Sequence, residues 1–168
     1  MIKPRFSLIP QYTFQSITDI STEKLEQLGI KFLMLDLDNT VAAYDEHVLL
    51  DDISSWIDGV KSVGIELFLI SNTTRTHRVE AFAESIGVEY IMRSFKPSPE
   101  SLLRAMEMKG YSSGESALVG DQVFTDALAA NRAGVISIIV RPKRFTNPFL
   151  VLRYCIEVPF RMMCKNKN

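Results

Sequence analysis

An apolar run that ends in two carboxylates is the segment that most restricts how this chain can fold. Residues Ile30–Leu37 predict a buried strand, and Asp36 and Asp38 stand at its end. Side chains alternate along an extended chain, so the two carboxylates share one face. Buried carboxylates are unfavourable unless they are paired or bind a metal. The segment therefore predicts a divalent metal site or acid–base chemistry where the strand ends.

Short apolar strands alternate with helices along the chain, whose 168 residues suit one domain with a full core. After a short helix over Ser21–Leu28, we expect strands over Ile30–Leu37, Ile65–Ile70, Val88–Met92, Ser116–Val119 and Val135–Val140. Helices are expected between them over Asp51–Val63, Arg75–Ile86, Pro97–Lys109 and Phe124–Arg132. This order predicts an α/β fold in three layers, with a central parallel sheet of about five strands and helices on both faces.

Polar residues follow several of the predicted strands. Ser71 and Asn72 come after the second strand, Lys96 after the third, and Asp121 after the fourth. In an open parallel sheet the functional site lies at the carboxyl ends of the strands. We therefore expect all of these side chains, together with the two carboxylates of the first strand, to lie at one edge of the sheet.

The order of these residues resembles the four motifs of the haloacid dehalogenase (HAD) superfamily of phosphatases. The resemblance covers about residues 30–140 and implies a Rossmann-like HAD fold. It rests on Asp36-x-Asp38-x-Thr40, Ser71, Lys96 and Gly120-Asp121 with Asp126.

The resemblance implies that Asp36 is a nucleophile that forms an aspartyl-phosphate and that Asp38 is the general acid and base. It also implies a Mg²⁺ cofactor, bound by the carboxylate of Asp36, the backbone carbonyl of Asp38 and the carboxylate of Asp121. Lys96 would bind the phosphate and stabilise its charge.

The other motif residues have supporting roles by the same resemblance. Ser71 and the backbone N–H of Asn72 would bind phosphate oxygens. Asp126 and Thr40 would lie behind the metal ligands, where Asp126 would orient Lys96 or a metal-bound water. Taken singly, each residue has a simpler interpretation, since Asp can form turns, Ser can cap a helix and Asp126 can be an ordinary acid in a first helical turn.

The spacing of the motifs leaves no room for a separate cap domain. Asp36 and Ser71 are separated by 34 residues and Ser71 and Lys96 by 24, whereas a cap domain would need about 50. The resemblance is therefore to the capless branch of the superfamily, whose open sites typically act on bulky substrates such as proteins, nucleic acids or lipids.

Charge is distributed unevenly along the chain. Residues 141–168 carry seven basic side chains and one acidic one (+6), whereas residues 1–140 carry 12 basic and 19 acidic ones (−7). We divide the chain into an arm and short helix (1–29), a HAD-like catalytic domain (30–140) and a basic amphipathic segment (141–168). This last segment could bind an anionic membrane surface. It could also dock on the sheet as a final helix with its Arg residues facing water, and the two interpretations are compatible.

The whole chain resembles the phosphatidylglycerophosphate phosphatases of the capless branch. The matching features are the Pro-rich N-terminal arm, Gly-Ile-Lys before the first strand, Asp-Leu-Asp-Asn-Thr, Ser-Asn followed by Arg78-Val79, Lys96-Pro97, Gly-Asp-Gln-x-x-Thr-Asp and the basic tail. This resemblance implies an anionic phospholipid monoester as substrate. One alternative is a phosphatase for a soluble phosphosugar, nucleotide or phosphoprotein. Another is a non-catalytic RNA- or ribosome-binding scaffold, although we do not expect nucleic acid to bind an acidic body with its catalytic acids intact. We expect a cytoplasmic protein with free Cys155 and Cys164, held peripherally at the inner face of the membrane through residues 141–168.

Overall fold

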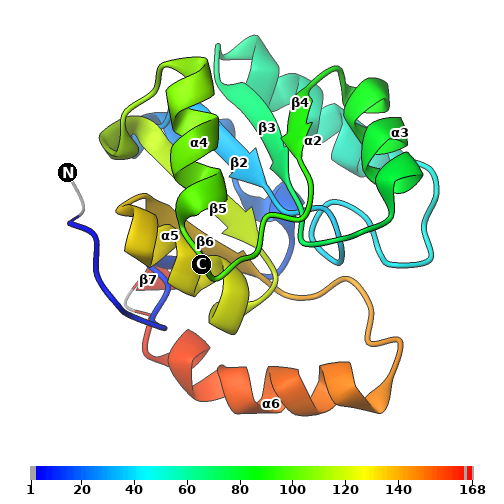
Figure 1. Ribbon diagram of the computed structural model, residues 1–168, viewed down its shortest axis with the longest axis vertical. Coiled ribbons are helices and arrows are strands. Elements are labelled where there is room, and N and C mark those ends of the chain that lie inside the picture. Colours follow the sequence, from blue (N-terminus) through cyan, green and yellow to red (C-terminus); the bar gives the residue numbers. More distant parts are fainter. Residues whose placement is uncertain (1–2, 165, 168) are drawn as a thin grey trace.

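The computed structural model describes residues 3–164 and 166–167 of the chain (Figure 1). Seven strands form one sheet in the order β4-β3-β2-β5-β6-β1-β7, and every neighbouring pair is parallel. The strands are β1 (Tyr12–Phe14), β2 (Phe32–Leu35), β3 (Glu66–Ile70), β4 (Glu89–Ile91), β5 (Ser116–Gly120), β6 (Ile136–Val140) and β7 (Asn166–Lys167).

The helices connect successive strands. They are the 3₁₀ turn η1 (Ile17–Asp19), α1 (Thr22–Gln27), α2 (Asp51–Ser62), α3 (Thr76–Ile86), α4 (Glu100–Lys109), the 3₁₀ turn η2 (Ser113–Glu115), the π-helical turn η3 (Val123–Ala127), α5 (Leu128–Ala133) and α6 (Pro148–Met162). No domain is inserted between β2 and β3 or between β3 and β4. Within the described residues no helix is both long enough and apolar enough to span a bilayer.

Two hydrophobic cores lie on the two faces of the sheet, because side chains alternate along each strand. On one face, Leu33 and Leu35 of β2 pack with residues of α1, α2 and α3. On the other face, Phe32 and Met34 pack with residues of α4 and α5, which lie in front of the sheet in Figure 1. The expected three-layer α/β fold without a cap domain is confirmed.

The sheet has two more strands than the sequence predicted. The five predicted strands are present as β2 to β6, and β1 and β7 extend the sheet beyond β6. Tyr12 of β1 pairs with Ile138 of β6. Tyr12–Phe14 does not stand out in the sequence as an apolar run, and β1 is defined by its parallel pairing with β6 and β7.

The predicted helix over Phe124–Arg132 forms in two parts. A π-helical turn, η3, comes first, and α5 follows it. The backbone N–H groups of Asp126 and Ala127 both donate to the carbonyl of Gln122, at 2.8 and 3.2 Å. Such turns have a wider backbone than an α-helix and occur often at functional sites. Here the turn carries Asp126 at the carboxyl edge of the sheet.

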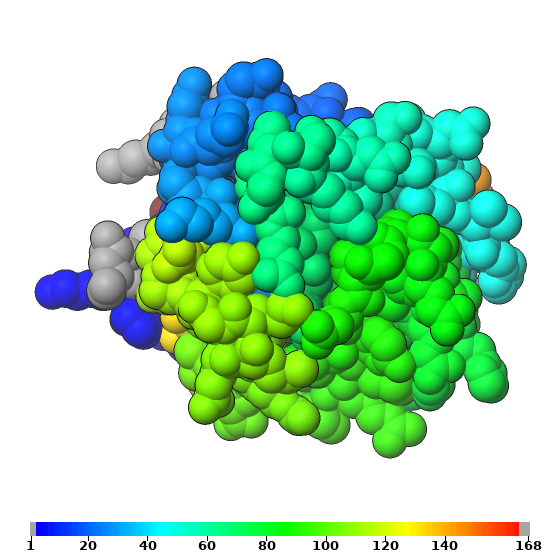
Figure 2. All heavy atoms as spheres, turned by 90° about the horizontal axis from the view of Figure 1, so that it is seen from above, coloured from blue at the N-terminus to red at the C-terminus, as the bar shows by residue number. Residues whose placement is uncertain are grey.

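The carboxyl ends of the strands all point to one edge of the sheet, where α6 lies (lower part of Figure 1). Figure 2 shows the opposite edge, which is formed by the turns that lead into β2, β3 and β5. The edge that carries α6 is therefore the one at which the sequence predicts the functional site.

Candidate active site

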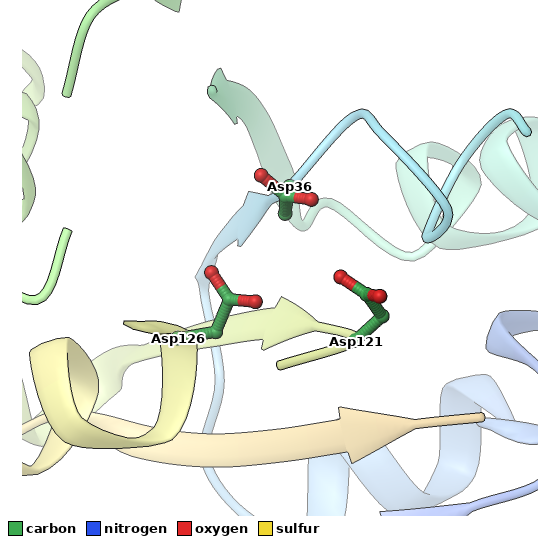
Figure 3. Close-up of side chains that lie close together, drawn as sticks. All are labelled: Asp36, Asp121 and Asp126. Atoms are coloured by element: carbon green, nitrogen blue, oxygen red, sulfur yellow. The ribbon is translucent and has the colours of Figure 1, made fainter. Parts of the chain in front are cut away.

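Three buried carboxylates meet at the carboxyl edge of the sheet. Asp36 follows β2, Asp121 follows β5, and Asp126 belongs to η3 (Figure 3). Their oxygen atoms lie within 4.8 Å of one another, and the three residues are 5%, 0% and 1% exposed. The structure thus brings together three acids that are up to 90 positions apart in the sequence.

Lys96 is the cation at the centre of this cluster. Its Nζ atom lies 2.5 Å from Oδ1 of Asp36 and 2.8 Å from Oδ1 of Asp126, and it also donates to the carbonyl of Ile70 at 3.0 Å. The lysine side chain is 1% exposed. With all groups ionised, Lys96 and the three carboxylates carry a net charge of −2, of which Arg153, 3.4 Å from Oδ2 of Asp121, offsets a part.

This imbalance shifts the pKa values of the acids. Burial raises the pKa of Asp36 to about 7, against the attraction of Lys96 and with added repulsion from Asp126. Burial and repulsion by Asp126 and Asp36 raise the pKa of Asp121 well above its usual range. Burial alone would lower the pKa of Lys96, but its ion pairs with Asp126 and Asp36 raise it, so this lysine stays charged.

The donor set fits a divalent cation. Oδ1 of Asp121 is buried and accepts no hydrogen bond from the described residues. Clustered carboxylate oxygens with an uncompensated negative charge are the ligands that Mg²⁺ prefers. A bound divalent cation would neutralise the charge that Lys96 leaves uncompensated.

The position of Asp126 depends on Gly120. Oδ2 of Asp126 accepts a hydrogen bond from the backbone N–H of Gln122 at 3.0 Å, and Oδ1 contacts Lys96. A Cβ atom on Gly120 would lie 2.3 Å from Cγ of Asp126, which is closer than any real contact of this kind. Glycine is therefore needed at the end of β5 so that the Asp126 carboxylate can pack against the strand.

Asp38 lies beside the cluster and pairs with a buried arginine. Nε of Arg78 donates to Oδ1 of Asp38 at 3.1 Å, and the two side chains are 5% and 14% exposed. The Thr40 hydroxyl is buried and has no hydrogen-bond partner among the described residues. The sequence predicts no role for Arg78, whose contact with Asp38 joins residues 40 positions apart in the chain.

The Ser71–Asn72 pair lies at the end of β3, as predicted. Ser71 is 1% exposed, and its hydroxyl accepts from the backbone N–H of Thr73 at 3.2 Å. The Asn72 side chain accepts from the backbone N–H of Lys96 at 2.9 Å and donates to its carbonyl at 3.0 Å. The Asn72 side chain therefore holds the loop that carries Lys96, a contact that the sequence did not reveal.

Helix α6 adds two arginines to this edge. Nη2 of Arg153 donates to Oδ2 of Asp121 at 3.4 Å. Arg161 donates to the backbone carbonyls of Asp121 and of Val140, the latter at 3.0 Å. The helix therefore docks on the sheet beside a predicted metal ligand.

The prediction that the arginines of a docked tail helix face water is wrong for Arg153 and Arg161. Their side chains are only 16% and 11% exposed. The cause is Glu157, which is 1% exposed and lies one helical turn from each of them. Its carboxylate is 3.9 Å from Nε of Arg153 and 3.2 Å from Nη2 of Arg161. A buried glutamate requires such partners, so the i, i+4 spacing of this triad was the signal for an inward-facing polar stripe.

Other positive charges of the basic segment are also paired within the protein. Nζ of Lys143 lies 3.8 Å from Glu46, and Nη1 of Arg144 lies 2.8 Å from Asp45. The side chains of residues 165–168 lie outside the described part of the structure. The charge of +6 therefore overstates what this segment can offer to an external anionic surface.

Comparison with known proteins identifies the family. Residues 9–134 match the family model of the haloacid dehalogenase-like hydrolases. The chain therefore belongs to this family, as its motif order indicates, and it is a HAD-superfamily phosphatase.

Two curated relatives and one solved structure resemble the chain. It is 30% identical to "Probable phosphatase YqeG" of Bacillus subtilis, over 100% of this chain and 95% of that protein. It is 26% identical to phosphatidylglycerophosphate phosphatase 1 of Arabidopsis thaliana, over 90% of this chain but only 46% of that protein. The 3-deoxy-D-manno-octulosonate 8-phosphate phosphatase of Moraxella catarrhalis, solved with magnesium and phosphate, has the same fold, with a TM-score of 0.57 and 15% identity over 87% of this chain and 81% of that one.

Gly120→Ala tests the packing of the carboxylate cluster. The added methyl group displaces the Asp126 side chain and with it the contact to Lys96, so we expect the variant to lose about 2 kcal/mol of stability and most of its phosphatase activity. The measurements are urea unfolding and phosphate release. Gly59→Ala is the matched control, because a Cβ atom there meets nothing within 4 Å. If both variants behaved alike, Asp126 would not depend on Gly120.

The raised pKa values predict how pH affects the stability of the metal-free protein. Because Asp36 and Asp121 bind protons more tightly in the folded than in the unfolded state, the stability they contribute is present below about pH 4 and is lost as the pH rises toward 7. In EDTA, Asp121→Asn should therefore gain Tm over the unsubstituted protein between pH 4.5 and 7.5. We expect the free energy of unfolding to rise by about 2 kcal/mol, which corresponds to an increase in Tm of roughly 4–8 °C.

Added Mg²⁺ is the control for this pH experiment. It should stabilise the unsubstituted protein at pH 7.5 and have little effect on Asp121→Asn. Two results would contradict the claim that unbalanced negative charge in the cluster destabilises the metal-free protein. One is a difference in Tm that stays constant with pH, and the other is equal stabilisation of both proteins by Mg²⁺.

Proposed function

We propose that the protein hydrolyses a phosphate monoester through a covalent aspartyl-phosphate on Asp36, and that its substrate is phosphatidylglycerophosphate. The observation that carries the proposal is the contact of one charged lysine, Lys96, with the buried carboxylates of Asp36 and Asp126 beside Asp121. This cluster joins an anionic nucleophile to a cation that can also contact a phosphate.

In the first step, a carboxylate oxygen of Asp36 attacks phosphorus and the bond from phosphorus to the leaving oxygen breaks. Asp38 gives its proton to that oxygen, so that phosphatidylglycerol leaves with a neutral hydroxyl group rather than as an alkoxide. The ion pair with Lys96 favours the ionised form of Asp36, which is the form that can attack. Lys96 also offsets negative charge on the transferred group.

In the second step, Asp38 takes a proton from a water molecule whose oxygen attacks phosphorus. The bond between phosphorus and Asp36 breaks, inorganic phosphate leaves, and the Asp36 carboxylate is restored. The buried Ser71 hydroxyl and the backbone N–H of Asn72 would hold the phosphate oxygens at the end of β3. Asp126, held by Lys96 and the backbone N–H of Gln122, would keep the lysine in place.

The residues that would hold Mg²⁺ are Asp36, the backbone carbonyl of Asp38 and Asp121. When bound, the cation would reduce the repulsion between the Asp36 carboxylate and an anionic phosphate. The orphaned oxygen of Asp121 and the raised pKa values support this assignment.

The surface around the site supports a lipid substrate. Phe95 and Val48 are 76% and 75% exposed on the loops that follow β4 and β2, at the edge that carries the carboxylates. On α6, the side chains of Phe149, Leu152 and Ile156 are 70%, 60% and 52% exposed, while the arginine–glutamate stripe faces inward. A helix with one apolar face toward solvent suits the surface of a bilayer. The Arabidopsis relative bears the name of this lipid activity.

The substrate is tested by phosphate release from phosphatidylglycerophosphate in mixed micelles, beside a panel of soluble phosphate monoesters. We expect Mg²⁺-dependent release from the lipid and at least a 10³-fold loss for Asp36→Asn, which keeps the shape of the side chain but not the nucleophile. Circular dichroism checks that the variant folds. Release from soluble esters alone would contradict the lipid assignment while leaving the chemistry intact.

Exposed apolar residues of α6 are expected to bind membranes. The double substitution Phe149→Ser with Leu152→Ser should lower co-sedimentation with vesicles rich in phosphatidylglycerol by about tenfold, because two large apolar side chains no longer enter the bilayer. The control is Leu103→Ser with Met108→Ser, which removes two similarly exposed apolar side chains from α4. Equal binding by the two double variants would rule out α6 as the membrane-binding element.

A further inference from the structure

A buried arginine joins the predicted proton donor to the loop beside it. Arg78 lies in the first turn of α3, just after the predicted phosphate-binding pair, and its side chain is 5% exposed. Each of its three nitrogens has a different partner. Nε donates to Oδ1 of Asp38 at 3.1 Å, Nη2 donates to the carbonyl of Ala43 at 2.6 Å, and Nη1 donates to the carbonyl of Glu46.

We propose that Arg78 is a positioning residue for the proton-transfer steps: it orients the carboxylate of Asp38 and fixes the flap, residues 41–50, beside it. The inference rests on the proposed function, because it takes Asp38 as the general acid and base. It adds a residue from α3 that none of the four motifs contains.

The contacts of Arg78 explain why the orientation is specific. Arg78 binds Oδ1 of Asp38, while Oδ2 has no hydrogen-bond partner among the described residues. The backbone of the same segment is tied to the flap, since Asn39 N–H donates to the carbonyl of Ala42 at 2.7 Å. The carboxylate, its backbone and the flap are therefore held as one unit, and Oδ2 is left to exchange a proton.

Only a guanidinium group can make this set of contacts. Its N–H donors lie in one plane and point in fixed directions. The Cζ atom of this group lies over the Phe82 ring, 4.9 Å from the ring centre. A lysine at position 78 would retain the positive charge but could not satisfy Asp38, Ala43 and Glu46 with one geometry. Loss of the guanidinium group would leave the carbonyls of Ala43 and Glu46 without this hydrogen-bond donor in a largely buried environment.

The rival interpretation is that Arg78 only stabilises the fold. The two interpretations differ in how the loss depends on the leaving group. A poor leaving group needs a proton from Asp38, whereas an activated aryl phosphate does not. A residue that only supports the fold would affect both substrates equally.

The experiment compares Arg78→Met and Arg78→Lys on an alkyl phosphate and an aryl phosphate. We expect the kcat of Arg78→Met for the alkyl ester to fall about 10–100-fold more than its kcat for the aryl ester, with small changes in KM. Arg78→Lys should show the same imbalance to a lesser degree. In an Asp38→Asn background the imbalance should disappear, because the two residues act on the same step.

Arg75→Met is the matched control, since Arg75 is exposed, lies three residues earlier and donates to the backbone carbonyl of Tyr44 at 3.4 Å. It should leave the ratio of the two rates unchanged. Equal losses on both substrates for Arg78→Met, or an imbalance that persists without Asp38, would overturn the proposal.

A second readout separates this proposal from the proposed function. Hydrogen–deuterium exchange of residues 41–50 should speed up much more in Arg78→Met and Arg78→Lys than in Arg75→Met, which loses one exposed contact of 3.4 Å to Tyr44. This difference is expected whether or not the protein hydrolyses phosphate esters. If no ester were hydrolysed and exchange in the flap still became faster, the proposed function would be wrong, but the inference that Arg78 fixes the flap would hold. If the exchange of the flap did not change, the positioning role of Arg78 would be refuted.

Discussion

Three buried carboxylates, two of which are paired with the same lysine, form the interaction on which the rest of this edge depends. Burial and mutual repulsion raise the pKa values of Asp36 and Asp121, and one ammonium group cannot balance the cluster. A bound divalent cation would relieve the same repulsion, so the electrostatics of the cluster fit a divalent cation. The surrounding contacts keep the charges in place, since Gly120 admits the Asp126 carboxylate and Asn72 holds the loop of Lys96.

The parallel sheet brings these distant residues together, and the segments outside the central strands complete the edge. Helix α6 packs an arginine–glutamate–arginine stripe against the end of β5, while Phe149, Leu152 and Ile156 face solvent. One helix thereby links the predicted metal ligand Asp121 to the surface that we propose for lipid. On the other side of the site, Arg78 links α3 to Asp38 and the flap. The site is thus supported from both flanks without a cap domain.

The fold and the predicted site residues could be inferred from the sequence because their signals are local. Apolar runs that stop at Asp36, Ser71 and Asp121 mark strand ends, and parallel strands align those ends. The inward orientation of Arg153 and Arg161 could not be inferred, because it depends on Glu157 being buried against η3. The role of Arg78 could not be inferred for a similar reason, since its partners are Asp38, 40 positions away, and two backbone carbonyls that only the folded flap presents. The strand β1 does not stand out in the sequence as an apolar run, and it is defined by its pairing with β6 and β7.

The most direct test of the nucleophile is chemical trapping of the covalent intermediate. The protein is mixed with Mg²⁺ and its phosphate ester, quenched, reduced with borohydride and digested for peptide mass spectrometry. A phosphorylated aspartate is reduced to homoserine, and we expect this conversion at Asp36 alone, with none in Asp36→Asn. Conversion at Asp38, Asp121 or Asp126, or turnover without conversion at any aspartate, would contradict the account.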